Sequence, residues 1–193
     1  VVMQLGTNDS TNRGNNVIYP DEDFSSTYAP AETEFKALLE KYAGEAKAKG
    51  ATPVMVSCMG RRADTKERGS LSAYAQAAME AAKEVGCPAI DLNGMSIEEY
   101  GALGADVGKA FNDGTHPSGY GGYLLSRCIV EGIRQDGLGL AKDITADAGA
   151  FDPGHPLPSH ADFKVPLEPG GTGFGRGRGR GTTAPTTKRG SGN

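Results

Sequence analysis

Three short apolar runs alternate with longer amphipathic stretches up to about residue 135, and this alternation limits the folds open to the chain. A continuous apolar run of about four to eight residues is typical of a buried strand, whereas apolar residues spaced i, i+3, i+4 and i+7 are typical of a helix with one buried face. Such alternation predicts an α/β fold with parallel strands and right-handed crossovers. We expect strands at Val1–Leu5, Pro53–Met59 and Pro88–Leu92, and helices at about Ala31–Lys49, Ser70–Val85, Ser96–Leu103 and Pro117–Gln135.

Glycines mark the ends of two predicted helices and the beginning of the last. Gly50 and Gly86 follow the first and second helices, where a glycine favours termination. Three more glycines fall in the first turns of the last helix, and each costs about 1 kcal/mol relative to alanine. Our hypothesis is that close backbone packing near a functional site accounts for Gly119, Gly121 and Gly122.

Polar residues follow the predicted strands at the points where a ligand would bind. In parallel α/β sheets, ligands bind at the carboxyl ends of the strands. Asn8 follows the first strand, Arg61 follows the second, and a turn with Asp113 and His116 precedes the last helix. These residues can therefore meet on one rim of the sheet. A sheet of three strands is narrow, however, and its first strand would have an unpaired edge.

Length and composition indicate one globular domain with tails. The chain has 193 residues, 37% of them apolar, and a formal charge of −4. No apolar run approaches the ~20 residues of a membrane span. The cysteines have no C-x-x-C spacing, so we interpret them as small buried residues and predict no metal site and no cofactor. These cysteines are Cys58, Cys87 and Cys128.

The sequence divides into three parts. Residues 1–150 carry the α/β pattern, residues 151–169 form a proline-rich segment that we expect to be extended and packed on the domain, and residues 170–193 form a basic Arg-Gly tail. The tail carries +5, so the first 169 residues carry −9. With no apolar run to bury, we expect the tail to be disordered. Because the chain begins inside a predicted strand, we expect the domain to be truncated upstream.

The turn 113–116 (Asp-Gly-Thr-His) can act as a proton relay. A carboxylate three residues before a histidine can accept the imidazole Nδ1–H, fix the tautomer and stabilise the imidazolium. The Nε2 atom is then left to take a proton from a nucleophile. The same spacing also occurs in local caps and surface hydrogen bonds, so a purely structural turn is the alternative for Asp113 and His116.

A second motif, Gly-Thr-Asn-Asp at residues 6–9, follows the first strand. The side-chain amide of Asn8 can donate to a developing oxyanion, and one such donor is typically worth ~3–4 kcal/mol of transition-state stabilisation. Gly6 and Asp9 would form the supporting turn. A tight turn without catalytic meaning is the alternative for this motif taken alone.

Together, in this order and at this separation, the two motifs resemble those of the SGNH/GDSL hydrolase family. Residues 6–9 match the family's third block, and residues 113–118 (Asp-Gly-Thr-His-Pro-Ser) match its fifth. Over roughly residues 1–166 the chain looks most like the rhamnogalacturonan acetylesterases. The resemblance implies a flavodoxin-like three-layer α/β/α fold and serine ester hydrolysis without a metal. It also implies that His116 is the general base, Asp113 its orienting acid and Asn8 an oxyanion donor.

The chain departs from the family at the nucleophile. The family's Gly-Asp-Ser block occurs nowhere in the sequence, and the second block's oxyanion glycine is also missing. Both belong upstream of Val1, together with the family's first two strands. Ser10, Ser57 and Ser118 are poor substitutes because of their context. We therefore expect the C-terminal part of an esterase, with no esterase activity of its own, since triad members act as a unit.

The implied substrate is an acetylated plant cell-wall polysaccharide of the pectin or rhamnogalacturonan type, hydrolysed by a secreted or periplasmic enzyme. Arg61 and Arg62 would suit its galacturonate carboxylates, because a guanidinium fork binds carboxylates well. A solvated pair of loop arginines is the alternative. Two other functions stay open: a non-catalytic carbohydrate-binding relative, and binding of RNA or acidic polymers through the Arg-Gly tail.

Overall fold

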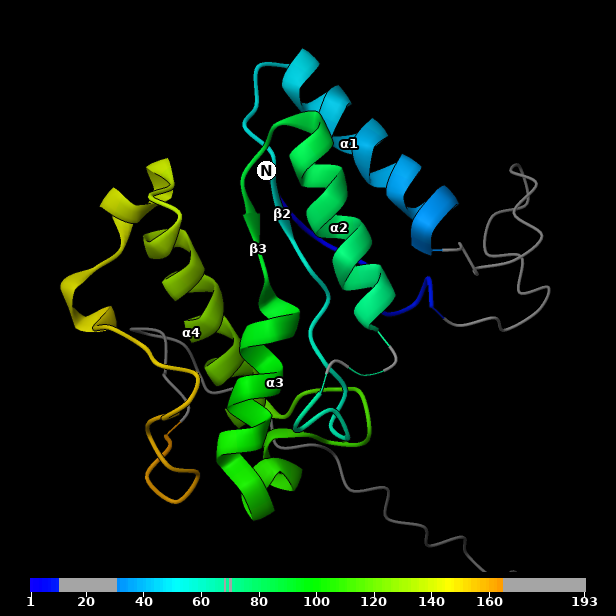
Figure 1. Cartoon of the computed structure of the whole chain (residues 1–193). Helices are drawn as coiled ribbons and strands as arrows, with labels where there is room; N and C mark the ends of the chain where they lie inside the picture. The colour runs from blue at the N-terminus through cyan, green and yellow to red at the C-terminus, as the bar shows by residue number, and fades with distance from the viewer. Residues whose placement is uncertain (11–30, 68, 70, 165–193) are drawn as a thin grey trace, which may run out of the picture. The chain divides into compact units, whose positions relative to one another are not determined.

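The computed structural model of the chain describes residues 1–10, 31–67, 69 and 71–164. Within these residues, three strands form one parallel sheet of order β1-β2-β3, which confirms the predicted α/β fold. The α-helices alternate with the strands along the chain (Figure 1). The elements are β1 (Val2–Gln4), α1 (Lys36–Ala48), β2 (Val54–Val56), α2 (Ser72–Val85), β3 (Ala89–Ile90), α3 (Leu92–Leu103) and α4 (Gly119–Gln135). A π-helical turn at Ala31–Phe35 leads into α1, and 3₁₀ turns lie at Gly104–Ala110, Gly139–Asp143 and Ala146–Ala148.

Helices cover both faces of the sheet, so the fold has three layers (Figure 1). On one face, Met55 packs in an apolar cluster with residues of α1 and α2 such as Leu39. On the other face, Val54 and Val56 pack with residues of α3 and α4 such as Leu124. Successive side chains of a strand point to opposite faces, so β2 is buried on both sides, as its apolar run predicts.

The first strand is less buried than we predict from its sequence. Val2 is 51% exposed and Leu5 is 44% exposed, so the prediction of a buried strand is wrong for these residues. The reason is that β1 pairs only with β2 and has no strand on its other side among the described residues. Met3, whose side chain alternates with that of Val2, is half-buried against the cluster formed by α1 and α2.

Local side-chain chemistry explains where α3 begins and where α2 ends. We predict the third helix from about Ser96, but α3 begins at Leu92, because Asp91 Oδ1 accepts a hydrogen bond from the Gly94 amide at 3.1 Å and caps the helix. The predicted stop of α2 is confirmed: Gly86 has a φ of 67° in the left-handed region, where glycine is favoured.

The cysteines are free thiols, and the prediction that they are buried is confirmed for two of the three. Cys58 and Cys128 are buried, and Cys87 is half-buried beside the cluster formed by α1 and α2. None of the helices in the described part of the chain has both the length and the apolar character needed to cross a bilayer. The expectation of a disordered tail at residues 170–193 lies outside the described residues.

The segment after α4 turns repeatedly and returns to the helical layer. Phe151 is buried, and the Arg127 guanidinium lies 5.5 Å from the centre of its ring. Phe163 packs its ring against those of Tyr120 and Tyr123 at centroid distances of 5.3 and 5.2 Å. These aromatic contacts tie residues 151–163 to α4.

One of the three glycines at the start of α4 fits the close-packing hypothesis. A Cβ atom on Gly121 would overlap the main-chain carbonyl of Ala110, so α4 can approach the end of the 3₁₀ turn Gly104–Ala110 this closely only through a glycine. Gly119 and Gly122 have open space where a side chain would be, so the hypothesis is wrong for them. Gly121 therefore lets α4 pack directly against the segment that leads into the turn 113–116.

A buried carboxyl group lies between α3 and α4. The Glu99 side chain is 0% exposed, and its Oε2 accepts a hydrogen bond from the Cys128 thiol at 3.2 Å. Its Oε1 has no hydrogen-bond partner among the described residues. Desolvation by burial, which the Cys128 hydrogen bond only partly opposes, raises the pKa of Glu99 from 4.5 to about 7. The neutral acid is therefore the form that this interface favours.

Replacing Gly121 should have the opposite effect to replacing Gly122. We expect Gly121→Ala to lower the free energy of unfolding by about 1–3 kcal/mol, because the methyl group meets backbone that cannot move aside cheaply. We expect Gly122→Ala to raise it by up to about 1 kcal/mol, through helix propensity alone. Urea denaturation of both variants measures the difference. Equal effects of the two substitutions would contradict the packing role of Gly121.

Glu99 should make stability depend on pH. Unfolding returns the Glu99 carboxyl to its usual pKa of 4.5. Between about pH 4.5 and 7, Glu99 is therefore mostly ionised in the unfolded chain and mostly protonated in the folded one. Stability should therefore fall across that range as pH rises, by roughly 3 kcal/mol at most. We expect Glu99→Gln to remove this slope in urea denaturation at pH 4, 6 and 8. The exposed Glu98→Gln should keep it, and an unchanged slope in Glu99→Gln would contradict the assignment.

Candidate active site

The turn 113–116 is closed by the carboxylate of Asp113. Its Oδ2 lies 2.7 Å from Nδ1 of His116, and its Oδ1 accepts hydrogen bonds from the amides of Thr115 and His116 at 2.7 and 2.8 Å. Those backbone hydrogen bonds, followed by the one to the imidazole, hold the pKa of Asp113 well below its usual range. The carboxylate therefore stays ionised near neutral pH and can orient the ring.

The His116 ring is open to a reaction partner. Its side chain is 77% exposed, and no described residue hydrogen-bonds its Nε2. With Nδ1 facing a carboxylate, the favoured neutral tautomer has its proton on Nδ1 and a lone pair on Nε2. The pair has the geometry that a general base needs. The predicted Asp113–His116 contact is thus present.

A short pair of extended segments holds this turn at the sheet. Phe111 and Pro117 form an antiparallel bridge, and the Asn112 amide donates to the His116 carbonyl at 2.8 Å. The ring of Phe111 packs edge-on against Tyr100 of α3, with centroids 5.1 Å apart. Just after this bridge, the Ser118 hydroxyl caps α4 by accepting a hydrogen bond from the Gly121 amide. His116 is therefore anchored on both sides of its turn.

The same local arrangement occurs a second time. In the segment Asp152–Pro156, His155 Nδ1 lies 2.7 Å from Asp152 Oδ2, and the Gly154 amide donates to Asp152 Oδ1 at 2.9 Å. The hydrogen bonds from His155 and Gly154 lower the pKa of Asp152 as well. This second pair is not among the predicted site residues, although the sequence Asp-x-x-His-Pro occurs at both places. The hydrogen-bonded pair alone therefore does not identify the catalytic histidine.

The motif at residues 6–9 forms a well-packed turn after β1. The Gly6 amide donates to Asp9 Oδ2 at 3.1 Å, and the Asp9 carbonyl accepts from the Tyr74 hydroxyl at 3.2 Å. Gly6 has a φ of 117°, and a Cβ there would press on Phe35 and Tyr74 at 3.3 Å, so only glycine suits this position. Asn8, in contrast, is exposed. The turn is thus rigid at its base and presents Asn8 outward.

The loop after β2 connects the two predicted turns. Nη2 of Arg61 donates to the Ser10 hydroxyl at 3.4 Å, which reaches the end of the turn that contains Asn8. The Arg62 amide donates to the Gly114 carbonyl at 3.2 Å, inside the turn 113–116. The structure therefore places the three sites predicted from the strand ends along one connected rim.

The connecting loop is itself supported from α3. The buried hydroxyl of Ser96 accepts from the Gly60 amide at 2.9 Å and donates to the Asn93 carbonyl at 3.0 Å. Asn93 in turn donates its side-chain amide to the Cys58 carbonyl at 3.1 Å. In addition, Asp64 Oδ2 accepts from the Arg61 amide at 2.8 Å. These bonds fix the backbone that leads to the rim.

Three described serines were candidates for the nucleophile, and the hydroxyl of each hydrogen-bonds a group other than His116. Ser10 donates its hydroxyl to the Thr7 carbonyl at 2.8 Å. Ser57 is buried and bonds Asp91 at 3.2 Å, and Ser118 donates to the Lys109 carbonyl at 2.7 Å. None of the three makes a hydrogen bond with His116. This agrees with the absence of a Gly-Asp-Ser segment from the sequence.

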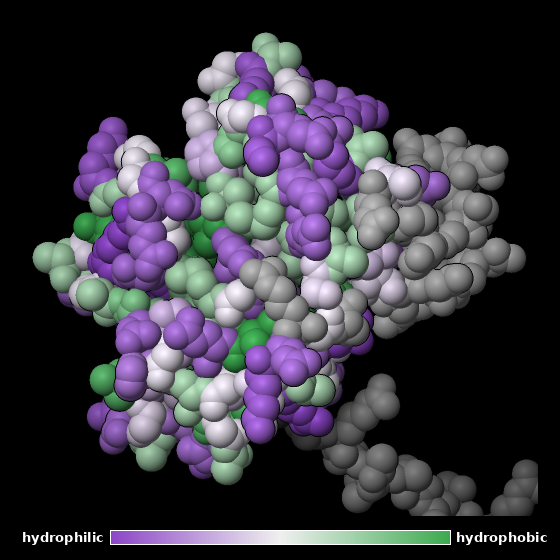
Figure 2. All heavy atoms as spheres, viewed as in Figure 1, coloured by the Kyte–Doolittle hydropathy of each residue, from purple (hydrophilic) through white to green (hydrophobic). Residues whose placement is uncertain are grey.

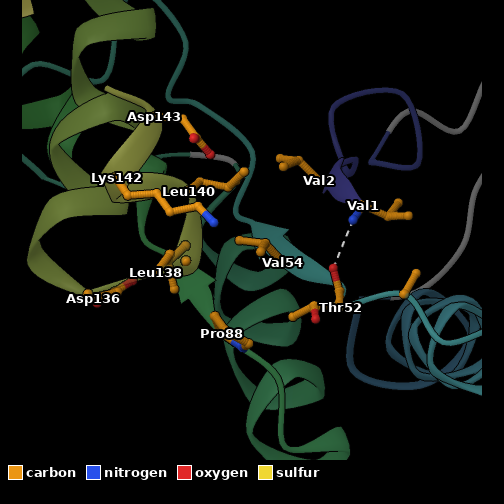
Figure 3. A pocket seen from close by; sticks show the side chains of 13 residues that line it. Val1, Val2, Thr52, Val54, Pro88, Asp136, Leu138, Leu140, Lys142 and Asp143 are labelled. Carbon is orange, nitrogen blue, oxygen red and sulfur yellow. Dashed lines mark hydrogen bonds between the residues drawn. The ribbon is translucent and has the colours of Figure 1, made fainter. Parts of the chain in front are cut away.

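No metal centre is seen in the described part of the chain, where no three His, Cys, Asp or Glu side chains cluster. A groove of about 730 Å³ lies near the beginnings of the strands, lined by residues such as Val2, Val54 and Leu140 (Figure 3). Figure 2 shows hydrophilic residues over much of the face seen in Figure 1, with hydrophobic residues visible between them. Because Asn8 and Arg61 follow the strand ends instead, this groove does not belong to the candidate site.

Comparison with known proteins agrees with the α/β fold. The fold is similar to that of a solved structure, the protein YxiM from Bacillus subtilis, with a TM-score of 0.57 and 24% identity. The match covers 72% of this chain but only 37% of that protein, so the chain spans well under half of its length. No curated protein matches the sequence. A family model matches residues 1–129, which include both turns of the rim, and the chain belongs to the GDSL-like lipase/acylhydrolase family.

Proposed function

We propose that this chain carries the base half of a serine ester hydrolase site. The observation that carries the proposal is the 2.7 Å contact between His116 Nδ1 and the Asp113 carboxylate. The Arg61–Arg62 loop connects this contact to the turn of Asn8. In the proposed site, His116 is the general base, Asp113 orients and stabilises its imidazolium, and Asn8 donates to the oxyanion.

The proposed reaction needs a serine from a Gly-Asp-Ser segment. His116 Nε2 would take the proton of that serine as its oxygen attacks the ester carbonyl carbon, and the Asn8 amide would donate to the resulting oxyanion. The imidazolium would then protonate the departing alcohol. A water molecule, deprotonated by the same Nε2, would hydrolyse the acyl-enzyme and release the acid. No step requires a metal.

The substrate that we propose is an acetylated polysaccharide of the pectin or rhamnogalacturonan type. Its support is the resemblance to the rhamnogalacturonan acetylesterases over residues 1–166, together with an exposed rim that suits a long substrate. Both His116 and Asn8 are exposed, so the base and the oxyanion donor can reach an ester on an extended chain without a deep pocket.

A non-catalytic carbohydrate-binding protein is the second candidate. It is favoured by one specific observation, the absence of a Gly-Asp-Ser segment from the 193 residues. The sequence of the polypeptide upstream of Val1 distinguishes the two candidates, because only the esterase requires that segment. Binding of acidic polymers through the Arg-Gly tail would add to either candidate and concerns residues outside the described part of the chain.

Hydrolysis of p-nitrophenyl acetate tests the esterase proposal. We expect the 193-residue chain alone to hydrolyse this ester no faster than its His116→Ala variant, because base and oxyanion donor fail without the nucleophile. In a polypeptide with a Gly-Asp-Ser segment ahead of Val1, we expect His116→Ala to lower kcat/KM by at least about 10³-fold.

His155→Ala is the matched control in that longer polypeptide. His155 has the same contact to its own aspartate at 2.7 Å and a comparable exposure of 86%, against 77% for His116. We expect the control to keep kcat/KM within about twofold, since that pair has no hydrogen bond to the rim loop. An equal loss in both variants, or activity of the short chain that depends on His116, would contradict the proposal.

A further inference from the structure

We propose that Arg61, and not its neighbour Arg62, binds a carboxylate of the substrate next to the candidate ester site. The inference rests on the proposed esterase function and assigns the two arginines of the rim loop different roles. The ligand class is an ester of a carboxylate-bearing sugar, a uronate.

The Arg61 guanidinium lacks an anionic partner. Its Nε is buried without a hydrogen-bond partner among the described residues, and its Nη2 reaches only the neutral Ser10 hydroxyl, at 3.4 Å. No described carboxylate forms a salt bridge with it, although a half-buried guanidinium normally acquires such a partner. The Nη atoms are not among the buried unpartnered atoms, so their remaining N–H donors can bind a carboxylate through two parallel hydrogen bonds.

Two carboxylates in the neighbouring turns accept hydrogen bonds from backbone amides. Asp64 Oδ2 accepts from the backbone amide of Arg61 at 2.8 Å, and Asp9 Oδ2 accepts from that of Gly6 at 3.1 Å. Each carboxylate therefore stabilises its own turn rather than neutralising the guanidinium through a direct ion pair. The side chain is held in place by the rim, while its charge remains available to an incoming anion.

Arg62 contributes through its backbone instead. Its side chain is exposed, where a charged group is well solvated and gains little from a single weak contact. Its amide donates to the Gly114 carbonyl at 3.2 Å and so supports the turn of the base. A change of the Arg62 side chain leaves that hydrogen bond intact.

The position of Arg61 suits a substrate that extends along the rim. The Arg61 guanidinium contacts Ser10, which lies two residues after Asn8. The next residue of the loop, Arg62, contacts the turn of His116 through its backbone amide. A carboxylate bound by Arg61 would therefore place the rest of its sugar beside the oxyanion donor and the base. Such a contact fixes the orientation of a substrate and selects charged over neutral sugars.

An NMR titration of the 193-residue chain tests the inference without requiring catalysis. Sodium galacturonate is the probe, and galactose with matched sodium chloride is the neutral control. We expect the Nε–Hε signal of Arg61 to shift saturably with galacturonate only. We expect Arg61→Gln to weaken binding at least tenfold and Arg62→Gln to leave it within twofold.

Arg61→Lys separates the guanidinium fork from simple charge. It keeps the positive charge, so we expect binding of intermediate strength, and it serves as the second variant if Arg61→Gln does not fold. Equal shifts with sodium chloride, or equal losses in Arg61→Gln and Arg62→Gln, would overturn the inference. Galacturonate binding by a chain whose longer form shows no His116-dependent hydrolysis would contradict the esterase proposal alone.

Discussion

The rim of the sheet depends on the hydrogen bonds made by the backbone of the loop after β2. The Gly60 amide donates a hydrogen bond to the Ser96 hydroxyl of α3, and the Arg62 amide donates one to the Gly114 carbonyl in the turn 113–116. Because β2 is buried on both faces, this loop starts from the most fixed part of the sheet. The position of a central strand thereby helps to fix the two turns that present Asn8 and His116 at the surface.

The two Asp-x-x-His turns show how context gives meaning to a local motif. Both have a 2.7 Å contact from carboxylate to imidazole, and in both the acid has a lowered pKa. Only the turn of His116 continues into the bridge between Phe111 and Pro117 and receives a hydrogen bond from the rim loop. The local sequence is sufficient to form the pair, whereas its hydrogen bond to the rim loop depends on a residue far away in the chain.

The sequence was sufficient to predict features that depend on local chemistry. The parallel order of the strands, the full burial of β2 and the stop at Gly86 follow from apolar runs, alternation and glycine conformation. The early start of α3 was missed because a single side chain, Asp91, overrides the periodicity. Other features depend on tertiary neighbours, which no local pattern encodes. They are the exposure of Val2, the close packing of α4 at Gly121, and the different surroundings of Arg61 and Arg62.

The repeated Asp-x-x-His-Pro spelling has a consequence for chemical labelling. His116 and His155 present rings of similar exposure, each held at Nδ1 by a carboxylate, so a reagent that modifies imidazole at Nε2 should reach both. His160, the third histidine of the chain, is exposed as well, so a loss of activity in the longer polypeptide would accompany modification of up to three histidines rather than of His116 alone. Assigning the effect to a single ring requires peptide mapping, or a chain in which one of these histidines has been replaced.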